Sequence, residues 1–127
     1  MAELTDTAGE EIDFDPADVT AITSTDPDTG GELTCLYGLS VGLVRTAEPV
    51  ATLIGRLRLE AKLAQLTRPD GSPVWIAGAA VISLRPPIQD QYPPAVQAVV
   101  SVTGLTQGVT ETPAQAKAAI DAHGGRL

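Results

Sequence analysis

Few residues of this sequence have side chains that could carry out chemistry. The segment DPDTGGE holds three carboxylates, Asp26, Asp28 and Glu32, and begins with the Asp-x-Asp pattern of a calcium loop. Position 30 offers no further carboxylate, and Tyr37 stands where an EF-hand loop carries its bidentate glutamate. A polar hairpin loop explains the same residue types. We therefore predict no metal centre and keep these three acids as the one calcium candidate.

Two further reactive side chains stand alone. His123 lies in the tail DAHGGRL, where we expect it to be solvated. Cys35 follows an alternating pattern beside Leu36, which favours a small buried residue over a reactive thiol. The sequence has no glycine-rich phosphate loop followed by Lys-Ser/Thr and no Cys/His spacing suited to zinc. We predict no catalytic residue and no cofactor, and hence a protein that is not an enzyme.

The charge of the chain is uneven. Residues 1–57 hold eleven acidic and two basic residues, a net charge of −9, whereas residues 58–127 have a net charge of +1. The segment from Glu3 to Glu32 has ten acids and no base, so it should repel phosphate and not bind nucleic acid. No apolar run approaches the roughly 20 residues that span a bilayer, and the acidic start is unlike a signal peptide. We expect cytoplasmic synthesis and no membrane insertion.

Turns and apolar positions occur twice in the same order. LTDTAGEEIDFDPADVTAI, from Leu4, aligns with LTRPDGSPVWIAGAAVISL, from Leu66, at an offset of 62 residues. After a loop around PPIQDQYPP, the offset becomes 66, and Gly38, Leu39 and Thr46 align with Gly104, Leu105 and Thr112. We interpret the chain as a tandem duplication, with an acidic repeat at 1–57 and a less charged repeat at 58–127.

Each repeat is predicted to be mainly β, with a short helix at its end. Alternation predicts strands near 2–6, 11–15, 18–23, 32–37 and 39–45. Helices are expected at 47–57 and 113–122, with Thr46 and Thr112 as N-caps. The stretch RLRLEAKL fits either strand or helix. The expected fold is β-rich α+β: two small antiparallel sheets or barrel-like repeats packed as a pseudo-dimer.

The repeated unit resembles the FlbD/SwrD family of small proteins associated with bacterial flagellar operons. In the first half, the turns and strand starts of the family lie in LTDTAGEEIDFDPADVTAI and LTCLYGLSVGLVRTAEPVATLI. In the second half they lie in LTRPDGSPVWIAGAAVISL and VVSVTGLTQGVTETPAQAKAAI. The resemblance implies a β-rich fold and a flagellum-associated role, and it supplies no catalytic residues. Family members are single units, whereas this chain is doubled, and Ala77-Gly78 replaces the Asn-Pro-like turn in the second unit.

Differences between the two halves point to a contact surface. Asp13, expected to face solvent, corresponds to Trp75, the only tryptophan of the chain. Asp15 and Asp18 correspond to Ala77 and Ala80. Loss of charge and gain of an aromatic side chain are typical of interface cores, so we predict an interface at Trp75, Ala77, Ala80, Val74 and Ile76. Packing of Trp75 onto the other half of the same chain is the alternative.

These features favour a non-enzymatic structural or assembly protein that acts through protein–protein contacts. The most concrete expectation is a decoration or minor capsid protein of a bacteriophage virion, associated with a protein partner or with copies of itself as a homo-oligomer. A flagellum-associated factor and a small acidic binding module or accessory subunit are the alternatives.

Overall fold

A computed structural model describes residues 1–88 and 90–125. The prediction of a β-rich chain with two helices is confirmed, because the described residues form ten strands and two α-helices. Neither helix is long and apolar enough to cross a membrane. The elements are, in chain order, β1 (Ala2–Thr5), β2 (Glu11–Phe14), the 3₁₀ turn η1 (Pro16–Asp18), β3 (Val19–Thr25), β4 (Glu32–Gly38), β5 (Gly42–Thr46), α1 (Val50–Leu57), β6 (Leu63–Thr67), β7 (Pro73–Ala77), the 3₁₀ turn η2 (Gly78–Ala80), β8 (Ser83–Arg85), β9 (Ala98–Val102), β10 (Leu105–Val109) and α2 (Pro113–Ala122).

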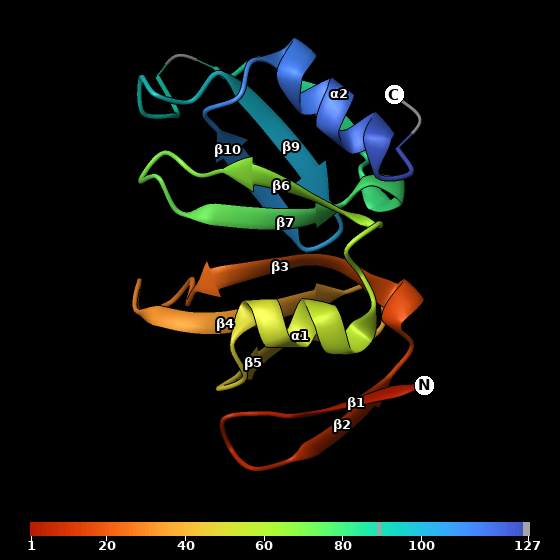
Figure 1. Cartoon of the computed structure of the whole chain (residues 1–127). Coiled ribbons are helices and arrows are strands. Elements are labelled where there is room, and N and C mark those ends of the chain that lie inside the picture. Colours follow the sequence, from red (N-terminus) through yellow and green to blue (C-terminus); the bar gives the residue numbers. More distant parts are fainter. Residues whose placement is uncertain (89, 126–127) are drawn as a thin grey trace.

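The ten strands form three antiparallel sheets, one of which crosses the middle of the chain (Figure 1). Its order is β5-β4-β3-β7-β6, so three strands of the first half continue into two strands of the second. The hairpin β1-β2 forms a separate sheet at one end of the molecule, and β10-β9-β8 forms the third sheet. We refer to the five-stranded assembly as the shared sheet.

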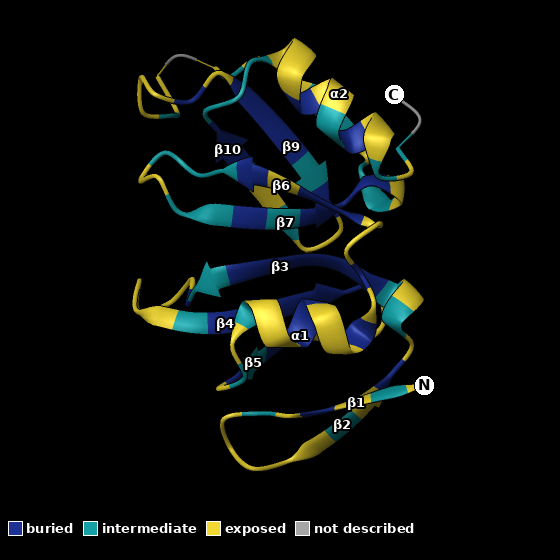
Figure 2. Cartoon of the chain, in the orientation of Figure 1, coloured by how far each residue is buried: buried dark blue, intermediate teal, exposed yellow. Residues whose placement is uncertain are grey.

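The shared sheet separates two hydrophobic cores. Successive residues of a strand face opposite sides of its sheet. Ile22 and Leu36 therefore belong to a first core with the β1-β2 hairpin and α1, whereas Ala21, Cys35 and Tyr37 belong to a second core with β9, β10 and α2. Strands β3 and β4 are accordingly dark along most of their length in Figure 2.

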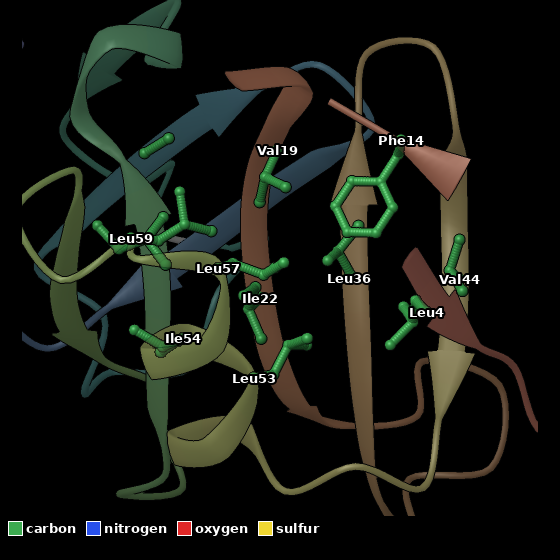
Figure 3. Packing of buried hydrophobic residues seen from close by; sticks show 12 residues of the cluster. Leu4, Phe14, Val19, Ile22, Leu36, Val44, Leu53, Ile54, Leu57 and Leu59 are labelled. Carbon is green, nitrogen blue, oxygen red and sulfur yellow. The ribbon is translucent and has the colours of Figure 1, made fainter. Parts of the chain in front are cut away.

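Hydrophobic side chains from several elements build the first core (Figure 3). Leu4 and Phe14 come from the β1-β2 hairpin, and Leu53 and Leu57 come from α1. All four are buried, with Leu53 fully inaccessible to solvent. Three aliphatic residues from the second half complete the same core, Leu59, Leu63 and Ala77.

A similar backbone hydrogen bond occurs in each half of the chain, between its first and last strands. Thr7 N, just after β1, donates to Arg45 O of β5 at 3.0 Å. Thr110 N, just after β10, donates to Thr67 O of β6 at 2.9 Å. A backbone hydrogen bond thus links the first and last strands of each half.

The helix predictions are correct for the second half and partly wrong for the first. Helix α2 spans Pro113–Ala122, and Thr112 forms a capping box with Gln115. Helix α1 begins at Val50, so Thr46 is not its N-cap; Pro49 occupies that position without a side-chain hydrogen bond. The Thr46 hydroxyl instead donates to Thr5 O at 2.9 Å, because it lies at the end of β5 beside β1.

Candidate interaction surface

The Asp26 loop is organised by an arginine. Asp26 Oδ1 accepts the Asp28 N–H at 2.9 Å, as in an Asx turn. Arg45 of β5 reaches the same loop, with Nε 3.3 Å from Asp26 Oδ2 and Nη2 bonded to Asp28. The backbone hydrogen bond and Arg45 lower the pKa of Asp26. Glu32 is exposed in β4 opposite Thr25. Arg45 therefore supplies the positive charge for two of the three carboxylates proposed as calcium ligands.

Cys35 and His123 both have structural surroundings. Cys35 is fully buried in the second core, and burial raises the pKa of its thiol. The predicted buried position of this cysteine is confirmed. His123 follows α2 and is half-buried, with Nδ1 2.7 Å from Ala119 O, so the ring is held against the last turn of the helix and is not freely solvated.

The predicted interface residues of β7 lie mostly inside the chain. Val74 and Ile76 are 0% and 1% exposed and belong to the second core. Ala77 is buried in the first core. These three side chains present almost no surface to another molecule, because β7 lies between β3 and β6 in the shared sheet.

Trp75 and Ala80 are half-buried and pack against the first core. Trp75 lies opposite Ile22 on one side and Gln65 on the other. The structure thus places Trp75 against the first half of the same chain, as the alternative interpretation has it. Ala80 lines an apolar groove of about 420 Å³ with Leu39 and Leu59, beside His123.

An acidic cluster lies on the β1-β2 hairpin and was not singled out from the sequence. Glu3 pairs directly with Asp13, and Glu11 lies on the same face, with carboxylate oxygens of all three within 4.8 Å of one another. A hydrogen bond to Glu3 and repulsion from Glu3 and Asp13 raise the pKa of Glu11. Pairing the two segments as a hairpin would have revealed the cluster, since side chains two residues apart share one face.

Strands β8 and β2 each have an open edge in the described chain. Strand β8 pairs with β9 alone, and β2 pairs with β1 alone. Strand β8 aligns with β3 at the 62-residue offset of the sequence, and the corresponding edge of β3 is covered by β7. Ile82, just before β8, is 67% exposed, and Ile88, just after it, is 50% exposed. Exposed aliphatic side chains beside an open strand are typical of a contact surface.

Two exposed apolar side chains line a hollow beside the open edge of β2. Leu39, in the turn between β4 and β5, is 58% exposed. It lines a hollow of about 520 Å³ together with Met1, Asp13 and Phe14. Met1 is 94% exposed. Both open edges are thus flanked by exposed apolar side chains.

No family model, curated protein or solved structure matches this chain. The resemblance of each half to the FlbD/SwrD family stays a prediction from the sequence.

Proposed function

We propose that this chain is a tandem duplication that serves as a non-enzymatic structural or assembly protein, most concretely a decoration or minor capsid protein of a bacteriophage virion. The observation that carries the proposal is the open edge of β8 with the exposed Ile82 beside it. The corresponding edge of β3 is occupied by β7 inside the chain. An edge strand with unpaired backbone groups binds another strand readily.

The order of elements supports the duplication. Two strands, a 3₁₀ turn, three strands and an α-helix occur in that order in each half. The turns η1 and η2 are separated by the same 62 residues that align the two halves of the sequence. Gly9 and Gly71, which also align, have positive φ angles of 86° and 89° in the first hairpin turn of each half.

The packing of two hydrophobic cores on the shared sheet supports a structural role. The shared sheet is covered on both faces by packed hydrophobic side chains, and the two halves are joined along β3 and β7. A rigid module with open strand edges at its ends is suited to bridging neighbouring protein surfaces.

The acidic cluster on β1-β2 supports the second candidate, an acidic binding module or accessory subunit. Glu3, Glu11 and Asp13 are exposed at one end of the molecule. Such a surface would attract a basic protein partner through long-range electrostatic steering. Addition of salt would then weaken binding strongly, whereas contact through the β8 edge would depend less on salt.

Size fractionation of the native protein tests the proposal. We expect the protein to sediment with particles of capsid-like size, and Ile82→Asp to reduce incorporation while Ala51→Asp, on the exposed face of α1, does not. Both changes add one negative charge at an exposed site. Recovery of the native protein solely in low-mass fractions, under conditions in which particles are present, would contradict the proposal.

A further inference from the structure

We propose that copies of this chain associate head to tail, with β8 of one copy pairing with β2 of the next. This inference rests on the proposed structural role and names the partner as a second copy of the chain. The proposed contact has the same form as the pairing of β3 with β7 inside the molecule. Strand β8 is the counterpart of β3, and β2 is the counterpart of β7, so the same junction can form between copies.

The register of the β3-β7 pair predicts the register between β8 of one copy and β2 of the next. Ile22 of β3 lies opposite Trp75 of β7 in an antiparallel pair. A shift of 62 residues places Leu84 of one copy opposite Asp13 of the next. Backbone groups at both open edges would gain hydrogen-bond partners, as they do between β3 and β7.

The junction would bring together two exposed aliphatic side chains. Thr20 Oγ1 donates to Thr103 O at 3.3 Å, which joins β3 to the turn between β9 and β10. The counterpart of Thr20 is Ile82, and the counterpart of that turn is the turn carrying Leu39. Ile82 and Leu39 are 67% and 58% exposed in the single chain. Contact between copies would remove both from water.

A third apolar residue follows the same pattern. Met1 corresponds to Leu63, which is 4% exposed because it lies in the first core across the internal junction. Met1 itself is 94% exposed beside β2. At the head-to-tail junction it would pack against the second half of the neighbouring copy, as Leu63 packs against the first half.

Charge disfavours a symmetric contact between two β2 edges. The first half carries a net charge of −9 and the second a net charge of +1. Contact between two first halves would place the acidic hairpins together, whereas a head-to-tail contact sets the acidic hairpin against a half that carries the exposed Arg85. Such heterologous contacts form rings when the rotation closes and filaments when it does not.

The external contact is more polar than the internal one. Ser83 and Ser101 stand where the internal junction has Ala21 and Cys35. We therefore expect reversible association, with a Kd on the order of micromolar rather than nanomolar.

Sedimentation velocity of the purified full-length chain tests the inference. The wild type should shift from monomer to larger species as its concentration rises through the micromolar range. Ile82→Asp blocks one end and Leu39→Asp blocks the other, and each should weaken association at least tenfold. Arg85→Glu is a second variant at the β8 end, and Ala51→Asp is the control that should associate like the wild type.

Mixing the two blocked variants distinguishes head-to-tail contact from a symmetric one. Ile82→Asp retains an intact β2 end and Leu39→Asp an intact β8 end, so their equimolar mixture should form dimers that grow no further. A monomeric wild type at all concentrations, unchanged association of Ile82→Asp, or a mixture that stays monomeric would overturn the inference. A monomeric chain that still sediments with particles would refute self-association alone, whereas self-association without particle incorporation would refute the proposed function alone.

Discussion

Trp75 of β7 lies directly opposite Ile22 of β3, which places the only tryptophan of the chain at the line where its two halves meet. Its side chain packs against the first core although its strand belongs to the second half. The counterpart position in the first half is Asp13, which is exposed because no further strand covers β2 in the described chain. Trp75 thus lies on a strand with neighbours on both sides, whereas Asp13 lies on a strand with an open edge.

Replacement of Trp75 should destabilise the fold. Trp75→Asp removes a half-buried aromatic side chain and places a carboxylate beside the first core, so we expect a loss of about 2–4 kcal/mol in the free energy of unfolding. Urea unfolding followed by circular dichroism measures this loss. Asp13→Ala, at the exposed counterpart, should change the stability by less than about 0.5 kcal/mol. Equal stability of Trp75→Asp and wild type would show that this side chain makes no internal contact of consequence.

Alanine should have opposite effects at two glycines. A Cβ on Gly78 would lie 2.5 Å from the carbonyl oxygens of both Ile120 and His123, where η2 meets the end of α2. We expect Gly78→Ala to cost about 1–3 kcal/mol, since backbone atoms must move. In Gly55→Ala the nearest atom is the flexible Glu60 carboxylate at 3.8 Å, so helix propensity should stabilise α1 by about 0.5–1 kcal/mol. Thermal unfolding of both variants shows whether each change raises or lowers the stability. A Gly78→Ala variant as stable as the wild type would contradict the packing of η2 on α2.

The contribution of Asp18 should depend on pH. The backbone N–H of Ser40 donates to Asp18 Oδ2 at 2.8 Å and lowers the pKa of that carboxyl below 3.8. A lowered pKa in the folded state gives stability that is present above the unfolded-state pKa and is lost as the pH falls through the folded value. Asp18→Ala should therefore be less stable than wild type at pH 7, with the difference shrinking below about pH 4. Urea midpoints at several pH values test this, and a constant difference down to pH 2 would be the contrary result.

Unlike ionised Asp18, the ionised acidic cluster should lower the stability of the fold at neutral pH. The pKa of Glu11 is raised by the hydrogen bond to Glu3 and by repulsion, so the folded state favours its protonated form. Its contribution is then most favourable below the unfolded-state pKa and is lost as the pH rises through the folded value. We expect Glu11→Gln to be more stable than wild type at pH 7 and low salt, with the gain reduced by salt or acid. Glu32→Gln, at the exposed first residue of β4, is the matched control; a gain of the same size there would locate the effect outside the cluster.

Local features of the fold could be predicted from the sequence. Alternation identified β2, where Phe14 is buried and Asp13 is exposed. A strand with one face in water has alternating apolar and polar residues, because successive side chains point to opposite faces. The Thr112-Pro113 pair located the start of α2 because the capping box involves only neighbouring residues.

Features that depend on distant residues could not be predicted in the same way. Val19–Thr25 has almost no alternation in burial, since β4 and β7 flank β3 and a core covers each of its faces. Nothing within that segment specifies β7 as its neighbour. Arg45 likewise lies 17 residues beyond Asp28 in the chain, so its pairing with the Asp26 loop depends on how β4 and β5 fold back together.

Both proposals require that the two halves form one body joined along β3 and β7. Urea unfolding followed in parallel by Trp75 fluorescence and by far-ultraviolet circular dichroism tests this most directly, because Trp75 reports on the junction and circular dichroism on the whole chain. We predict a single transition with the same midpoint by both signals. Loss of the Trp75 signal at a lower urea concentration than the loss of secondary structure would show that the halves separate before they unfold, and would contradict the shared sheet.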